Sequence, residues 1–323
     1  MRNWIGPRVR IRTEFILSLV FLAFIAALPL SVSNDYWRGV IIVSMVFAML
    51  AAAWNLLAGY TGQFSLAPAT FSMLGAYTTG LLSYYFAAPP LVGIASSVVV
   101  SGAIGFALGR IVLRLSGPYL ALTTLSFAEI IRLVISNSIE ITRGDLGLNV
   151  PGLIENRLLY YYLMVAVLIA MQIFLFKLLS PPVGLYLRAI RDDEIAAATR
   201  GVDVVTWKTN AFAISAALSG LAGALYAHFA HFVSPELGLL SQTGLIISMS
   251  VIGGLGSLVG PLVGAFLVYV ASEHLRDFGG IQLIVFAALV IIFGRFFREG
   301  LWGLVYRAVE RAVRRSSPAA AAK

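Results

Sequence analysis

The chain has 323 residues, of which 59% are hydrophobic and 12% are charged, and its formal net charge is +8. A soluble globular domain carries about 25% charged residues, so this composition excludes an ordinary soluble protein and indicates an integral membrane protein. Apolar runs of roughly 18 or more residues recur, as α-helical spans require, whereas β-barrel strands would alternate over about 10 residues. The basic residues gather at the ends of these runs, so we expect membrane lipid and no nucleic acid as a partner.

Several kinds of reactive site are missing from the sequence. Cysteine is absent, and the three histidines, His228, His231 and His274, have no metal-binding spacing. No Gly-x-x-x-x-Gly-Lys-Ser/Thr motif occurs, so we do not expect this chain to hydrolyse ATP. Without a catalytic triad or carboxylate pair, we expect no enzyme activity, no catalytic residue, no metal site and no cofactor.

The N-terminal segment carries four arginines ahead of an apolar run from Phe15 to Val32. This order resembles a secretory signal, but the run of about 18 residues is longer than the usual signal core of about 7 to 15. We therefore expect residues 1–14 to be a cytoplasmic arm and the run to be an uncleaved first span.

The apolar runs predict an all-α, polytopic membrane protein with about ten transmembrane helices. The spans are expected near residues 15–33, 38–58, 70–87, 91–113, 118–136, 158–178, 207–232, 241–255, 258–273 and 279–296. The runs at 241–255 and 258–273 are short, so eight full spans plus a re-entrant hairpin remain the alternative. Residues 15–296 would form the transmembrane domain, and residues 297–323 a basic cytoplasmic tail.

The basic residues also predict the orientation of the chain. If the N-terminus is cytoplasmic, only Arg38, Arg143, Arg157 and Arg276 fall in the segments outside the membrane. Arg132 lies within a span and all the others lie on the cytoplasmic side, as the positive-inside rule requires, and an even number of spans places both termini there.

Two glycine-rich interruptions break the apolar pattern, at Gly59–Thr70 and at Gly253–Ala265. Each has Gly-x-x-Gly followed by proline, which predicts a two-half internal repeat. Such breaks at bilayer depth need protein or water around their backbone and often mark a translocation path, although ordinary turns are the alternative. The expected path residues are Gly59, Gly62, Gln63, Ser65, Pro68, Gly253, Gly256 and Pro261.

Small residues recur at every fourth position in two spans, a spacing that lets membrane helices approach closely. We interpret both series as packing faces: Ser101, Gly105 and Gly109, and Ser215, Ser219, Gly223 and Ala227.

An intramembrane charge pair occurs in SFAEIIRLV, where Glu129 and Arg132 are three residues apart. This spacing places both side chains on one helix face. Charged residues within spans are candidates for function, so a structural ion pair, a contact with substrate and proton coupling through Glu129 all remain open.

The segment LRAIRDDEIAAATRGVD, from Leu187 to Asp203, is polar and lies between two long apolar runs of the sequence. Its sequence predicts a two-turn helix with Asp192 as N-cap, acidic residues in the first turn and Gly201 at C′. A helix this short needs a partner or its own membrane domain for stability. We expect residues 186–206 to be a cytoplasmic coupling segment, and its coupling residues are Asp192, Asp193, Glu194, Ala196, Ala197, Ala198, Arg200 and Gly201.

Four ordered motifs resemble the permeases of branched-chain amino-acid ABC importers, and especially the longer of their two paired subunits. They are NLLAGYTGQFSLAPATFSMLGAY, RLSGPYLALTTLSFAEIIRLV, LRAIRDDEIAAATRGVDVVTWK and IGGLGSLVGPLVGA. The resemblance extends from about residue 50 to 295. Two departures occur: Ile195 stands where the coupling motif begins with glutamate, and Ala67-Pro68-Ala69 replaces the frequent Gly-His-Ala, so no role of that histidine transfers.

The resemblance implies the permease subunit of a bacterial inner-membrane importer for branched-chain amino acids or a related small amide such as urea. The implied partners are a second homologous permease subunit, two cytoplasmic ATP-binding subunits and an extracytoplasmic solute-binding protein. The outer connection from Asn137 to Arg157 would meet the binding protein, or it is a solvated loop. A stand-alone, ion-coupled secondary transporter and a membrane scaffold without transport are the alternatives.

Overall fold

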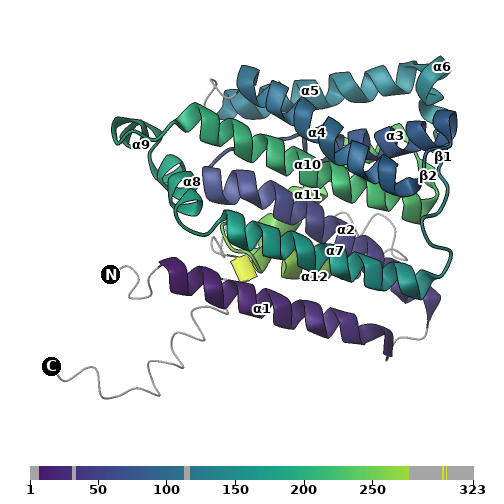
Figure 1. The fold of residues 1–323 in the computed structure, drawn as a ribbon, viewed down its shortest axis with the longest axis horizontal. Helices are drawn as coiled ribbons and strands as arrows, with labels where there is room; N and C mark the ends of the chain where they lie inside the picture. Colours follow the sequence, from purple (N-terminus) through teal and green to yellow (C-terminus); the bar gives the residue numbers. More distant parts are fainter. Residues whose placement is uncertain (1–6, 31–33, 113–116, 276–299, 302, 304–323) are drawn as a thin grey trace.

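The computed structural model describes residues 7–30, 34–112, 117–275, 300, 301 and 303, nearly all of them as helix (Figure 1). The long helices are α1 (Pro7–Ala27), α2 (Asp35–Asn55), α3 (Pro68–Phe86), α4 (Pro90–Val112), α5 (Pro118–Asn137), α7 (Arg157–Leu178), α10 (Val204–Ala230), α11 (Leu240–Gly253) and α12 (Gly260–His274). Shorter elements are η1 (Leu28–Leu30), the π-helical η2 (Leu56–Thr61), α6 (Ile139–Thr142), η3 (Gly144–Leu146), α8 (Val183–Asp192), α9 (Glu194–Thr199) and η4 (Pro235–Gly238). Strands β1 (Leu148–Asn149) and β2 (Phe232–Val233) pair antiparallel.

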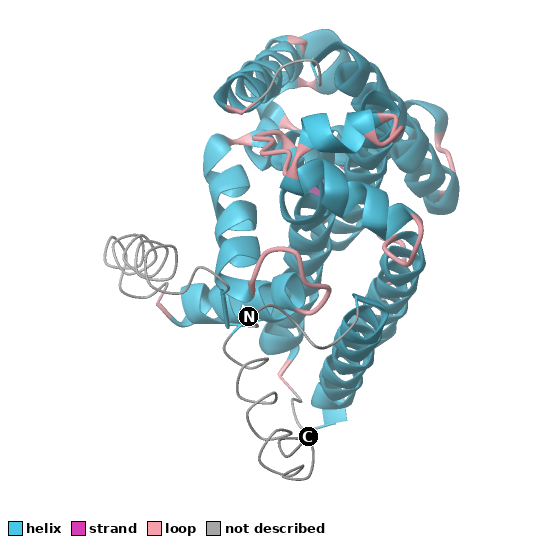
Figure 2. Ribbon diagram, turned by 90° about the vertical axis from the view of Figure 1, so that its left-hand side faces the viewer, coloured by secondary structure: helices cyan, strands magenta, loops and turns pink. Residues whose placement is uncertain are grey.

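The observed helices match the spans expected from the apolar runs. Every expected span between residues 15 and 273 falls on a helix, while 279–296 lies outside the described residues. Within the described residues, five segments are long and apolar enough to cross a membrane: α2 with η2, α4, α5, α7 and α10. Figure 2 shows the small strand pair as the exception among helices, so the expected all-α, multi-pass class is confirmed.

Local sequence explains where several helices begin. Pro68 and Pro118 occupy the first turn of α3 and α5, where the missing N–H would have had no helical partner. The Asn156 side chain accepts hydrogen bonds from the backbone N–H groups of Leu158 and Leu159 and so caps α7. Helix α1 already begins at Pro7, within the segment expected to be an arm.

The α11–α12 hairpin runs along the whole of α2. Helix α11 has 14 residues, which is about 21 Å and short of a hydrocarbon core of about 30 Å. Nevertheless, Asn55 at one end of α2 donates to the carbonyl oxygen of Ser257 at the hairpin tip, at 2.8 Å. At the other end Tyr36 Oη donates to Glu273, near the end of α12. The hairpin tip and α12 therefore extend along α2 from one of its ends to the other.

The expected packing faces bring α10 against α3 and α4. A Cβ added to Gly223 would lie 1.9 Å from the carbonyl oxygen of Ser72, and one added to Gly105 would lie 2.4 Å from the Cβ of Ala216. Larger side chains at these glycines would separate the helices. The predicted role of both series in packing is confirmed, since their members are buried.

The connection between α5 and α7 is anchored on the end of the bundle opposite α8 and α9 (Figure 1). His228 Nδ1 lies 2.7 Å from the carbonyl oxygen of Pro151, which can only accept, so this nitrogen carries the proton. His228 Nε2 then accepts from the Thr79 hydroxyl at 2.8 Å. The buried histidine thus joins α10, α3 and the loop, which is a structural role.

Candidate functional site

Helices α8 and α9 project from one end of the bundle, the end at which α1 begins (Figure 1). The N-cap of α9 is Asp193, whose Oδ1 accepts from Ala196 N at 2.9 Å. The expectation that Asp192 is the N-cap is wrong, because Asp192 is the last residue of α8. Asp193 has the extended backbone that an N-cap needs, with φ of −160° and ψ of 109°.

The other end of α9 has the expected glycine. Gly201 has a φ of 83°, and Val202 N donates to the carbonyl oxygen of Ala197 at 3.2 Å, which closes the helix as a C′ glycine does. Ala197 is buried in a small apolar cluster with Ile190 and Val204. The remaining α9 residues are exposed, Ile195 by 79%.

An ion pair fixes α9 to α10. Lys208 Nζ lies 3.1 and 3.0 Å from the two carboxylate oxygens of Glu194, and Lys208 is only 5% exposed. Asp203 caps α10, and the hydrogen bonds from Thr206 hold the pKa of its carboxyl below the usual value. Sequence reasoning missed Lys208, because Glu194 and Lys208 lie on two different helices and only the turn between α9 and α10 brings them together.

Helix α8 lies against η2, the first glycine-rich interruption. Arg191 Nη1 donates to the carbonyl oxygen of Gly59 at 2.7 Å, and a Cβ on Gly62 would lie 3.1 Å from Arg191 Cγ. The guanidinium carbon of Arg188 lies 5.6 Å from the ring centroid of Tyr60. The polar segment is therefore joined directly to the interruption, through arginines that the sequence did not single out.

The two glycine-rich interruptions meet each other, and we name their contact the glycine junction, formed by Gly59 and Gly256 with Asn55. A Cβ on Gly59 would lie 2.5 Å from Gly256 N. Asn55 accepts from Gly256 N at 2.8 Å and donates to Ser257 at 2.8 Å. The cavity beside the junction measures only about 10 Å³, so no solute fits there.

The other expected path residues lie around this junction. The indole N–H of Trp54 donates a hydrogen bond to the backbone carbonyl oxygen of Ser65 at 2.8 Å. Gln63 is 2% exposed, and its side-chain amide has no hydrogen-bond partner within the described residues. The backbone of Gly253 packs against that of Gly260, and Pro68 and Pro261 lie in the first turns of α3 and α12.

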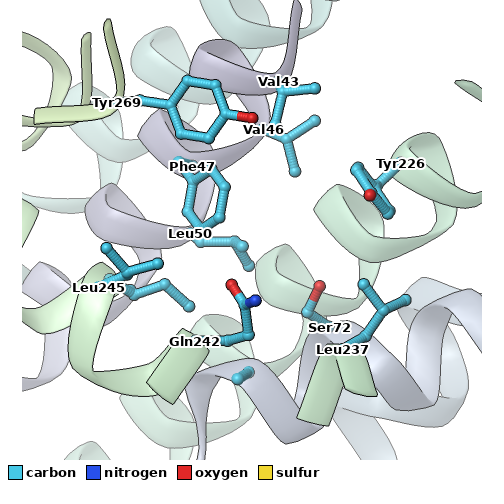
Figure 3. A pocket seen from close by; sticks show the side chains of 12 residues that line it. Val43, Val46, Phe47, Leu50, Ser72, Tyr226, Leu237, Gln242, Leu245 and Tyr269 are labelled. Carbon is cyan, nitrogen blue, oxygen red and sulfur yellow. The ribbon is translucent and has the colours of Figure 1, made fainter. Parts of the chain in front are cut away.

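A larger cavity, which we name the inner cavity, lies farther along α2 from α8. Its volume is about 210 Å³, and its walls come from α2, α3, η4, α10, α11 and α12. Its lining is mostly apolar and includes Val43, Val46, Phe47, Leu50, Leu237, Leu245 and Ile246. Figure 3 shows the Gln242 amide and the Ser72 hydroxyl pointing into it, with Tyr226 and Tyr269 at its sides. None of the expected path residues lines it.

Glu129 and Arg132 form the expected ion pair. Arg132 Nε donates to Glu129 Oε2 at 3.1 Å, and a second contact joins Arg132 Nη2 to Glu129 Oε1. The Glu129 side chain is 48% exposed on the outer face of α5. Neither residue lines the inner cavity or belongs to the glycine junction.

Comparisons with known proteins find permease proteins of transport systems. The profile of a family described as the permease component of branched-chain amino acid transport systems matches residues 36–309. The high-affinity branched-chain amino acid transport system permease protein LivM of Salmonella typhimurium is 31% identical over 308 residues, covering 86% of this chain and 72% of that protein. LivM of Escherichia coli is 32% identical over 311 residues, with the same coverage. The permease protein LivH of Salmonella typhimurium is 20% identical over 278 residues, covering 76% of this chain and 89% of that protein. No solved structure matches the chain.

Proposed function

Because this chain belongs to the permease family of branched-chain amino acid transport systems, we propose that it moves a branched-chain amino acid through the bacterial inner membrane in an ATP-driven importer. The chain is a permease component, as the four ordered motifs suggested. The ATP-hydrolysing subunits are separate chains in this proposal, which is supported by the missing phosphate-binding motif.

The observation that carries the proposal is the hydrogen bond from Arg191 to the carbonyl oxygen of Gly59. It connects α8 to the glycine junction, and the Glu194–Lys208 ion pair connects α9 to α10. An ATPase subunit that binds the exposed face of α9, around Ile195 and Ala198, would move the junction when it closes on ATP. The path would then open and close by a change in helix packing between two arrangements.

The orientation follows from the same end of the bundle. Arg188, Arg191, Arg200 and Lys208 all belong to the α8–α9 end, which we therefore place in the cytoplasm together with both termini. The binding protein would meet the opposite end, where β1, β2 and the loop after α5 lie. Residues 297–323, apart from Gly300, Leu301 and Gly303, lie outside the described residues.

A second permease subunit would cover α5. Glu129 is in the middle of this helix and half exposed, and a charged group facing hydrocarbon at mid-bilayer is unfavourable by about 2.5–3.5 kcal/mol. A protein or water surface beside α5 would remove that cost. Salmonella typhimurium has two permease proteins named for one transport system, LivM and LivH, and this chain is similar to both.

Reconstitution tests the proposed function. The chain, its second permease and its ATPase subunits are placed in proteoliposomes, with the binding protein and radiolabelled leucine outside. We expect leucine uptake that requires ATP and persists without an ion gradient. Uptake by the single chain driven by a proton or sodium gradient would instead support the secondary transporter, and an absence of any transport would support the scaffold.

A further inference from the structure

A second cavity, which we name the outer cavity, lies at the end of the bundle opposite α8 and α9. Its volume is about 250 Å³, and its lining includes Tyr36, Val40, Arg157, Phe229 and Glu273. It shares Val43 and Tyr269 with the inner cavity, so the two spaces adjoin. Both are smaller than the roughly 300–1,000 Å³ of sites for drug-sized ligands, which suits a solute the size of an amino acid.

The outer cavity contains charges of both signs. Arg157 comes from the first turn of α7, and Glu273 from the last turn of α12. Arg157 Nη1 donates to the backbone carbonyl oxygen of Asp35 at 3.1 Å, and Tyr36 Oη donates to the Glu273 carboxylate. Within the described residues, Arg157 forms no ion pair with a carboxylate. The guanidinium therefore keeps donors that could bind an anionic group.

Arg157 is also unusual in its position, because it is one of the few basic residues on the proposed outer side. Orientation in the membrane does not explain a positive charge there. Its neighbours in the cavity, Phe229 and Tyr269, are aromatic, and the ring of Tyr269, which lines both cavities, lies 5.2 Å from the ring of Phe47 in the inner cavity. The two cavities together thus present a cation, an anion and an apolar extension.

We propose that the outer cavity binds the zwitterionic head group of an α-amino acid, a proposal that rests on the permease function above. The substrate carboxylate binds the planar guanidinium of Arg157, whose donors match the two carboxylate oxygens. The substrate ammonium binds the Glu273 carboxylate. The aliphatic side chain extends past Tyr269 and Val43 into the inner cavity, where Val46, Leu50 and Leu245 surround it.

This arrangement selects against related solutes. Urea and other small neutral amides carry neither charge, so they would not form the two ion pairs with Arg157 and Glu273 that a zwitterion forms. Hydrogen bonds to charged groups contribute more than those between neutral groups, so a solute that lacks one of the two charged groups should bind more weakly. The proposal therefore assigns the chain to free amino acids rather than to amides.

Equilibrium binding to the purified transporter, without the binding protein, tests the site. The probes are leucine, leucinamide, which lacks the carboxylate, and 4-methylpentanoate, which lacks the ammonium. We expect wild type to bind leucine about tenfold more tightly than either analogue. Arg157→Gln should lose the preference for leucine over leucinamide, and Glu273→Gln the preference for leucine over 4-methylpentanoate. These ratios do not depend on the folded fraction.

Arg143→Gln is the matched control. Arg143 lies at the same end of the bundle, over the ring of Tyr84, and lines neither cavity, so its variant should keep both preferences. Unchanged preferences in Arg157→Gln and Glu273→Gln, or no leucine binding by wild type, would overturn the site. So would variants that lose only affinity for the binding protein, since the cavity would then be a docking surface. Failure of the permease function is detected by a separate measurement, in which the wild-type transporter in proteoliposomes shows no ATP-driven uptake.

Discussion

At the end of the bundle that carries α8 and α9, backbone packs on backbone, whereas at the opposite end the same helices stand apart around two cavities. A Cβ on Gly59 would lie 2.5 Å from Gly256 N, and a Cβ on Gly256 would lie 3.1 Å from the carbonyl oxygen of Gly59. The inner and outer cavities measure about 210 and 250 Å³. Close packing resists gradual deformation, so the junction is suited to two discrete states and the cavities to holding a solute.

The largest effect is expected from filling the glycine junction. In Gly59→Val the added Cβ would lie 2.1 Å from Asn55 Oδ1 and 2.5 Å from Gly256 N. We expect uptake to be abolished and the free energy of unfolding to fall by about 1–3 kcal/mol. Uptake in proteoliposomes and chemical denaturation measure the two effects. The control is Gly244→Val in α11, where no atom lies within 4 Å of the new Cβ; equal behaviour of the two variants would contradict a closed junction.

Breaking the link between α8 and the junction should have the next largest effect. Arg191→Met keeps the length of the side chain but removes its hydrogen bond to Gly59. Since hydrogen bonds to charged groups contribute about 1.5–3 kcal/mol, the ATP hydrolysed per leucine transported should rise about tenfold. Parallel ATPase and uptake assays give this ratio. Arg110→Met serves as the control, because Arg110 is a basic residue in the last turn of α4. An unchanged ratio of ATP hydrolysed to leucine transported in Arg191→Met would remove this link from the mechanism.

A smaller loss of coupling is expected at the end of α9. Gly201 has positive φ and open space around it, so Gly201→Val tests backbone conformation alone. The left-handed conformation is unfavourable by roughly 1–2 kcal/mol for such a residue, and coupling should fall about fivefold. Gly201→Asn, which tolerates positive φ, should retain most of it. If valine and asparagine couple equally well, the C′ geometry of α9 is not needed for transport.

The smallest effect is expected for the ion pair between α9 and α10. Lys208→Met removes the buried partner, while Glu194 is half exposed and can be hydrated instead. An ion pair with one exposed member contributes about 0.2–1 kcal/mol, so amide hydrogen exchange at Ala196–Ala198 should accelerate only about twofold. Exchange measured by mass spectrometry on the intact transporter checks this. A much larger acceleration would mean that the pair, more than the apolar cluster around Ala197, holds α9 in place.

Local sequence was sufficient for the helices and for the polar segment, because span length, caps and charge bias act within a few residues. The N-cap predicted for α9 was wrong by one residue, Asp192 in place of Asp193. Either aspartate can cap a helix, and only the length of α8 decides between them. The two-half internal repeat stays a prediction. The expected path residues were read from glycine and proline, which mark breaks in helices and not the side chains that line a cavity.

Apolar length and charge along the chain alone determined that this protein is a multi-pass helical membrane protein, and the four ordered motifs indicated its permease family. Only the tertiary structure decided that Arg191 reaches Gly59, 132 residues away in the chain, and that the two interruptions close on each other. It also decided that Arg157 and Glu273 face one cavity. Such contacts join residues on different helices, and which faces meet depends on the packing of the whole bundle and not on any local pattern.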